Sequence, residues 1–105
     1  MQVQTSGDVE VYASAVQAFL RADPCSRNVL LTVIDLLRSA PTTYPVTPSF
    51  WWITDSDSVV GAASWTPPHN LLVSSLPNDA AGDLATAAMH RATELGLRLR
   101  GVSGP

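Results

Sequence analysis

The sequence predicts a mixed α/β domain, and three patterns along the chain predict it. Apolar residues recur at helical spacing between residues 8 and 40. Two apolar runs, at 49–54 and 59–65, flank the polar turn 55–58 and indicate an antiparallel hairpin. Residues 71–102 then have the pattern strand, helix, strand, which is typical of a parallel crossover unit. Because both kinds of pairing are needed, we expect a mixed α+β sheet.

Two helices are expected before the hairpin. The first follows Asp8, whose carboxylate can cap it. Its apolar stripe consists of Val9, Tyr12, Ala13, Val16 and Leu20. The pair Asp23-Pro24 ends this helix and starts the next, with Asp23 as the N-cap and Pro24 in the first helical position. The second helix ends before Pro41. Its apolar stripe consists of Leu30, Val33, Ile34 and Leu37.

The predicted strands lie between breaks made by proline. The segment 41–48 contains three prolines and is expected to be irregular. The strand at 49–54 has apolar side chains on both faces, as in a strand that is covered on both sides. The two successive prolines at 67–68 end the second hairpin strand, and a third strand is expected at Leu71 to Ser75. A short strand at Gln2 to Thr5 precedes the helices.

The last part of the chain predicts a long helix and a half-exposed strand. The helix runs from about Asp79 to Leu95 and ends at Gly96 in the C′ position, with Leu97 packing back on it. Its apolar face consists of Leu84, Ala88, Ala92 and Leu95. Residues 97–102 alternate as a half-exposed strand would. The expected order is therefore strand, helix, helix, strand, strand, strand, helix, strand.

Composition excludes several classes of function. A chain of 105 residues with 46% hydrophobic and 14% charged residues is expected to form one globular domain over residues 1–105. The net charge of −3 disfavours nucleic acid, because phosphate binding needs a concentrated basic surface. The sequence has neither a secretory signal pattern nor an apolar run long enough for a membrane, and its single cysteine fits a reducing compartment. We therefore expect a cytoplasmic protein with no membrane partner.

Four segments together carry a resemblance to a known family. They are FLRADPCSRNVLLT at 19–32, VVGAASWTPP at 59–68, the strand-to-helix step at 71–88, and GVSGP at 101–105. With the predicted order of elements, they resemble the GNAT acetyltransferase family. More narrowly, the chain is similar to the degenerate N-terminal half-domain of two-part actinobacterial GNAT proteins. The resemblance implies a GNAT-like half-domain over nearly the whole chain.

The resemblance also implies where acetyl-CoA would bind. Active GNAT domains start the helix after the fourth strand with a Q/R-x-x-G-x-G/A loop, whose backbone N–H groups bind the pyrophosphate. The stretch 76–83 stands in that position, with Gly82 as its single glycine and with no preceding Gln or Arg. Asp79 and Asp83 would oppose the diphosphate. The residues that would bind the cofactor, if an acetyl-CoA site survives, are Ser75, Asn78, Asp79, Ala80, Ala81 and Gly82.

These departures favour a GNAT-like domain without a competent acetyl-CoA loop that acts as a structural, interaction or dimerisation module. The last predicted strand corresponds to the fifth strand of the family, so we expect it to pair with a second copy in a homodimer or with a GNAT-type partner domain. One alternative is an acetyl-CoA-dependent N-acetyltransferase with a direct-attack mechanism, in which backbone N–H groups of Asn78 to Gly82 hold the pyrophosphate. Another is a small-ligand module with a tryptophan-lined groove between the strand at 71–75 and the last strand.

Other candidate groups give no catalytic assignment. The chain has one cysteine, Cys25, and two histidines, His69 and His90, which are too few and too far apart for a metal site. We expect Cys25 to fill space at a helix start and both histidines to lie at the surface. The two glutamates, Glu10 and Glu94, belong to predicted helices, so no predicted strand carries a carboxylate base.

The tryptophans and the last two arginines have plain structural interpretations. Trp51, Trp52 and Trp65 are expected in the core and on the sheet faces, with at least one pair meeting across the ladder. The alternative is that one tryptophan lies in a pocket or an interface. Arg98 and Arg100 are expected to protect the edge of the last strand against strand addition, or alternatively to bind an anion.

Overall fold

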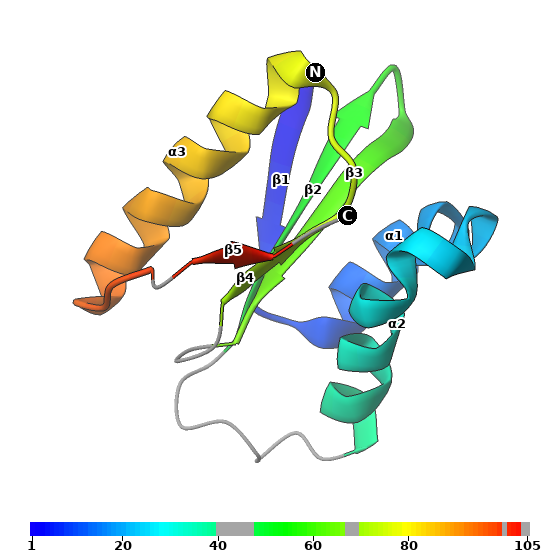
Figure 1. Ribbon diagram of the computed structural model, residues 1–105, viewed down its shortest axis with the longest axis horizontal. Helices are drawn as coiled ribbons and strands as arrows, with labels where there is room; N and C mark the ends of the chain where they lie inside the picture. The colour runs from blue at the N-terminus through cyan, green and yellow to red at the C-terminus, as the bar shows by residue number, and fades with distance from the viewer. Residues whose placement is uncertain (40–47, 67–69, 100, 104–105) are drawn as a thin grey trace.

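A five-stranded mixed sheet organises the molecule (Figure 1). The computed structural model describes residues 1–39, 48–66, 70–99 and 101–103, and within 24–26 it describes the backbone alone. The elements, in chain order, are β1 (Gln2–Ser6), α1 (Val9–Ala22), α2 (Pro24–Ser39), β2 (Ser49–Asp55), β3 (Ser58–Trp65), β4 (Leu71–Val73), α3 (Asn78–Leu95) and β5 (Val102–Ser103).

The sheet follows the chain order β1-β2-β3-β4-β5. The first four strands pair antiparallel with their neighbours, and β4 pairs with β5 in parallel across the α3 connection. The mixed α/β class and the order of elements expected from the sequence are confirmed. The short N-terminal strand exists and extends to Ser6, one residue beyond its expected end.

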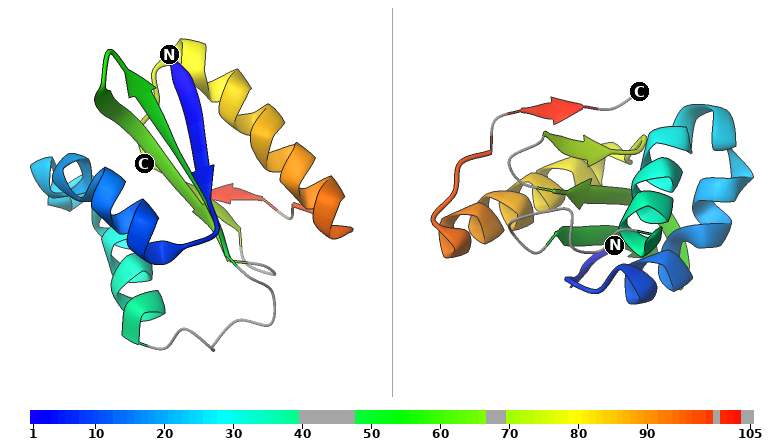
Figure 2. Two further views of the ribbon diagram at one scale, coloured as in Figure 1. Left: turned by 180° about the vertical axis from the view of Figure 1, so that it is seen from behind. Right: turned by 90° about the horizontal axis from the view of Figure 1, so that it is seen from below.

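The helices cover the two faces of the sheet. Helices α1 and α2 lie on one face and α3 lies alone on the other (Figure 2). Along β2, Phe50 belongs to the core under α1 and α2, whereas Trp51 belongs to the core under α3. Ala62 and Ala63 of β3 alternate in the same way. The strand at 49–54 is thus buried from both sides, as its apolar pattern predicts.

The apolar stripes of α1 and α2 lie against the sheet as expected. Both stripes are buried except for their partly buried members Val9 and Val33. The Asp8 carboxylate caps α1 by accepting the Glu10 N–H at 2.9 Å. The Asp23 carbonyl accepts the Arg27 N–H at 3.1 Å, so this residue joins the end of α1 to the first turn of α2.

The hairpin between β2 and β3 closes in a two-residue turn. Asp55 pairs with Ser58, and the residues between them, Ser56 and Asp57, have positive φ angles of 50° and 69°. Two successive positive φ angles define a type I′ turn, whose twist matches that of the flanking strands. The polar segment 55–58 therefore forms the tight reversal that its position between two strands predicts.

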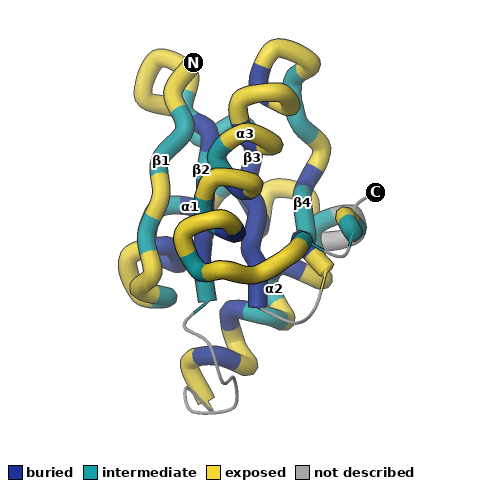
Figure 3. Tube along the Cα trace, turned by 90° about the vertical axis from the view of Figure 1, so that its left-hand side faces the viewer, coloured by how far each residue is buried: buried dark blue, intermediate teal, exposed yellow. Residues whose placement is uncertain are grey.

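Helix α3 starts at Asn78 and ends in a Schellman motif. Gly96 has a φ of 67°, and its N–H bonds to the Thr93 carbonyl at 3.1 Å. The N–H of Leu97 bonds to the Ala92 carbonyl at 2.9 Å. The expected packing of the Leu97 side chain is wrong, because that side chain is exposed while Leu99 packs against the core. Figure 3 shows that the exposed turns of α3 face away from the sheet.

Strand β4 is shorter than the expected 71–75. The Ser74 N–H still donates to the Ala62 carbonyl at 2.9 Å, as in a ladder. The Ala62 N–H, however, donates to Ser74 Oγ at 3.0 Å, so a side chain takes the place of the next strand carbonyl. This replacement ends the ladder at Val73.

The strand expected at 97–102 is also wrong in its extent. Strand β5 is formed by Val102 and Ser103 alone, which pair with Leu71 and Leu72. The Leu71 N–H bonds to the Gly101 carbonyl at 3.0 Å, so the contact with β4 begins only one residue before β5. Arg98 is exposed outside the strand and does not protect its edge, and Arg100 lies outside the described residues.

Tyr12 is the most enclosed polar group of the α1 face. Its ring is 0% exposed and stacks on Phe50, with ring centroids 4.5 Å apart and planes at 17°. Its hydroxyl is buried and has no hydrogen-bond partner within the described part of the chain. Burial raises the pKa of the Tyr12 phenol well above its ordinary range, because the phenolate would lose its solvation.

We expect Tyr12→Phe to stabilise the fold by about 1 kcal/mol, because it removes a buried hydroxyl without a partner and keeps the stacked ring. The unfolded phenol releases its proton near pH 10, whereas the folded phenol keeps it. The free energy of unfolding is therefore unaffected by this titration below about pH 10 and declines above it, by about 1 kcal/mol between pH 10 and pH 11.

Urea unfolding of both proteins at about pH 8 and about pH 11 measures these effects. The chain has no lysine, so few other groups titrate in this range. A Tyr12→Phe protein that is less stable at the lower pH, or that keeps the whole alkaline loss, would contradict this account.

Candidate functional site

The start of α3 is the position at which the GNAT resemblance implies a cofactor. Pro77 precedes the helix and provides no side-chain cap. The N–H groups of Ala80 and Ala81 both bond to the Pro77 carbonyl, at 2.9 and 3.3 Å. Within the described residues, the N–H groups of Asn78 and Asp79 are left as the free donors of the first turn.

The six residues named for the cofactor lie at this end of the helix, but they do not form one surface. Asn78, Asp79, Ala81 and Gly82 are exposed, as is Ser75 in the preceding loop. Ala80 is 1% exposed and belongs to the core under α3. The Ala80 side chain thus faces the sheet, whereas the other five residues are exposed around the start of the helix.

The charge and shape of this end do not match a diphosphate. Asp79 and Asp83 place two carboxylates in the first turns of α3, where they stabilise the positive end of the helix dipole. A Cβ added at Gly82 would meet nothing within 4 Å. The glycine is therefore not required by close approach of another chain segment, and the negative charges repel a phosphate.

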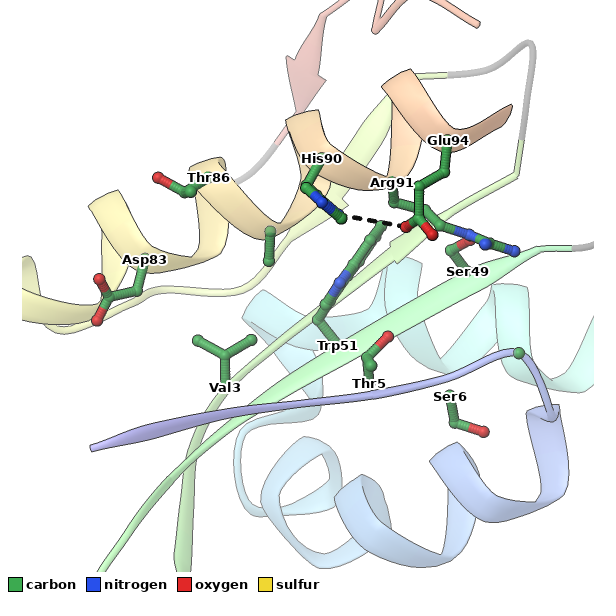
Figure 4. Close-up of a pocket in the computed structure, with 12 residues that line it drawn as sticks. Val3, Thr5, Ser6, Ser49, Trp51, Asp83, Thr86, His90, Arg91 and Glu94 are labelled. Carbon is green, nitrogen blue, oxygen red and sulfur yellow. Dashed lines mark hydrogen bonds and ion pairs between the residues drawn. The ribbon is translucent and has the colours of Figure 1, made fainter. Parts of the chain in front are cut away.

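A cavity of about 570 Å³ lies elsewhere, between α3 and the β1–β2 edge of the sheet (Figure 4). Helix α3 contributes residues at the spacing of a single helix face. The β1 end contributes three residues of the strand and Gly7 of the turn into α1. The residues that line the cavity are Val3, Thr5, Ser6, Gly7, Ser49, Trp51, Asp83, Thr86, Ala87, His90, Arg91 and Glu94.

Four hydrogen bonds or ion pairs hold the polar walls of this cavity. Arg91 Nε donates to Ser49 Oγ at 3.1 Å, and Ser49 is 3% exposed. His90 Nδ1 lies 3.3 Å from the Glu94 carboxylate, one helical turn away. Thr5 Oγ1 donates to the Phe50 carbonyl at 3.0 Å. Ser6 Oγ accepts the Asp8 N–H at 3.0 Å.

The tryptophans are core residues, as expected, and one of them also reaches the cavity. Trp51 and Trp65 are buried under α3, and Trp52 is half-buried 6.1 Å from the Tyr12 ring. Trp51 and Trp65 belong to the same core on neighbouring strands, but no two tryptophans stand directly opposite each other. The register places Ala63, Ala62 and Ser49 opposite Trp51, Trp52 and Trp65, respectively, so each large ring faces a small side chain.

The remaining candidates divide between the surface and the undescribed part of the chain. The expected surface position of His90 is confirmed, since its side chain is 77% exposed and pairs with Glu94. Glu10 and Glu94 lie on helices, as expected. His69 and the Cys25 side chain fall outside the described residues.

Arg91 was not identified from the sequence, although a signal for it exists. It follows Leu84 by seven positions and Ala88 by three, so it falls on the apolar stripe that faces the sheet. A cation at a core-facing position of an otherwise alanine-rich helix indicates a hydroxyl, a carboxylate or a cavity beneath it. Ser49 and Thr5 gave no such signal, because they reach the cavity only through tertiary contacts.

No protein-family model, curated protein or solved structure matches this chain. Within the described ranges, no three His, Cys, Asp or Glu side chains come together in a group that could hold a metal ion. No helix in the described part is both long and apolar enough to cross a bilayer.

We expect Gly82→Ala to stabilise the protein by about 0.5–1 kcal/mol, because an exposed glycine inside a helix costs conformational entropy and a Cβ here meets open space. Thermal unfolding followed by circular dichroism measures the change. A matched variant is expected to destabilise instead: Gly96→Ala would strain a residue with a φ of 67°. A destabilised Gly82→Ala would show that the backbone at this position is not ordinary helix.

Proposed function

We propose that this chain is a GNAT-like interaction module and that it does not use acetyl-CoA. The order of its elements and the parallel β4–β5 pair support the resemblance inferred from the sequence. The observation that carries the proposal is the start of α3. Asp79 and Asp83 occupy it, and the Ala80 and Ala81 N–H groups are already bonded to Pro77. A diphosphate would meet two like charges and few free donors.

The outer side of β5 is the proposed contact surface. The Leu71 N–H bonds to the Gly101 carbonyl at 3.0 Å, while Leu71 itself stands opposite Val102. In a parallel ladder this arrangement turns the N–H and C=O groups of Val102 away from β4, toward the open edge. The Val102 side chain is 64% exposed. An edge strand with free backbone groups and an apolar side chain suits strand addition.

The partner that we propose is a second copy of this chain, joined through β5, and a GNAT-type partner domain is the alternative. A homodimer needs no further component, and it pairs the β5 strand of one copy with the β5 strand of the other. The chain offers a matched pair of variants for this edge. Val102→Pro removes the outward N–H, and Val102→Ala shortens the side chain but keeps that donor.

The first test is calorimetric titration with acetyl-CoA, for which we expect no binding at micromolar concentrations. The carboxylates of Asp79 and Asp83 are the physical reason. Micromolar binding that is weakened by raising the salt concentration would contradict the proposal and favour the acetyltransferase alternative.

The second test is sedimentation at micromolar concentrations. We expect a dimer for the unmodified chain and for Val102→Ala, and a monomer for Val102→Pro, because the proline removes the outward donor of the edge. Circular dichroism of all three proteins checks that the fold is unchanged. A monomer mass for the unmodified chain would overturn the homodimer.

A further inference from the structure

The cavity between α3 and the β1–β2 edge contains a cation, Arg91, that has no charged partner among the described residues. Arg91 is half-buried, and its Nε bonds to the neutral hydroxyl of Ser49. Glu94, one turn further along α3, pairs with His90 instead. Within the described residues, no carboxylate lies within ion-pair distance of Arg91. A partly buried guanidinium in this state is stabilised by an anion from outside.

The geometry of Arg91 fits a carboxylate. Because Nε is already used, the two terminal nitrogens remain, and together they form the planar fork that binds the two oxygens of a carboxylate. Ser49 Oγ accepts from Arg91 and Ser6 Oγ accepts from Asp8, so each hydroxyl keeps its own O–H to donate. In Figure 4, Arg91 lies above Ser49, away from Asp83 at the opposite end of the residues drawn.

The rest of the cavity fits an apolar body with one negative charge. Val3, Trp51 and Ala87 line its wall, and its volume of about 570 Å³ is that of a site for a small organic molecule. Asp83 and Glu94 are also among the lining residues. The negative charges of these two side chains repel a ligand with two charges, such as a phosphate dianion, more strongly than a ligand with one carboxylate.

We propose that this cavity binds a small monocarboxylic acid, with the carboxylate on Arg91 and the apolar part against Val3, Trp51 and Ala87. The inference is independent of dimer formation, because the cavity lies at the β1–β2 edge of the sheet and the proposed contact surface at the β5 edge. Ser49 acts as a positioning residue, since it fixes the guanidinium through Nε.

The test is a nitrogen-proton NMR titration of the full chain with three probes: 3-phenylpropionate, its neutral analogue 3-phenylpropanamide, and inorganic phosphate. We expect 3-phenylpropionate to shift the Arg91 Nε–H and Trp51 indole resonances. The amide should bind about tenfold more weakly or worse, because it cannot form the charged fork. Phosphate should leave the Trp51 resonance unchanged. The proposal would be overturned if the amide binds as tightly as the acid. It would also be overturned if none of the three probes shifts the Arg91 Nε–H and Trp51 indole resonances.

Variants separate Arg91 from general charge effects. Arg91→Gln is expected to reduce the affinity for 3-phenylpropionate by about tenfold or more, and Ser49→Ala by a smaller factor. Arg98→Gln removes the same charge from an exposed arginine that does not line the cavity, so its affinity should match the unmodified chain. Unchanged affinity in Arg91→Gln would contradict the assignment. The comparison of acid with amide needs no variant and decides the question if a variant does not fold.

Discussion

The fold depends on the burial of β2 from both sides. This strand lies between β1 and β3, and its residues alternate between two separate cores. Phe50 packs with Tyr12 under α1 and α2, while Trp51 and Ile53 pack under α3. The side chains of one strand thus link two helical layers that make little contact with each other. Because successive side chains of a strand point to opposite faces, a substitution at one position of β2 disturbs one core, and a substitution at the next position disturbs the other.

Small residues in β3 make this double burial possible. Ala62 and Ala63 stand opposite Trp52 and Trp51, so the large rings of β2 have room beside the sheet. Gly61 has the same role for the chain that enters α3, because Leu76 packs where a Cβ would lie, with its Cδ2 2.4 Å from that position.

The local elements could be predicted because their causes are local. The α1 and α2 stripes, the turn at 55–58 and the Gly96 helix end each follow from spacing or from a backbone preference. The length of β4 could not, because it depends on a tertiary hydrogen bond from the Ala62 N–H to the Ser74 side chain. The pairing of the tryptophans depends on strand register, which apolar runs on both faces leave open. The cavity combines Arg91 with residues from β1 and β2, and their proximity is a property of the tertiary structure.

The short pairing between β4 and β5 has a consequence for how the molecule opens. Strand β5 is attached to the described sheet through two residue pairs, whereas β2 and β3 pair over most of their lengths. Because local opening costs least where few bonds and little apolar surface are lost, β5 can detach from β4 while the buried residues of both cores stay in place. In the monomer, the amide hydrogens of 101–103 should therefore exchange with solvent long before those of β2, and a partner bound along β5 would slow that exchange.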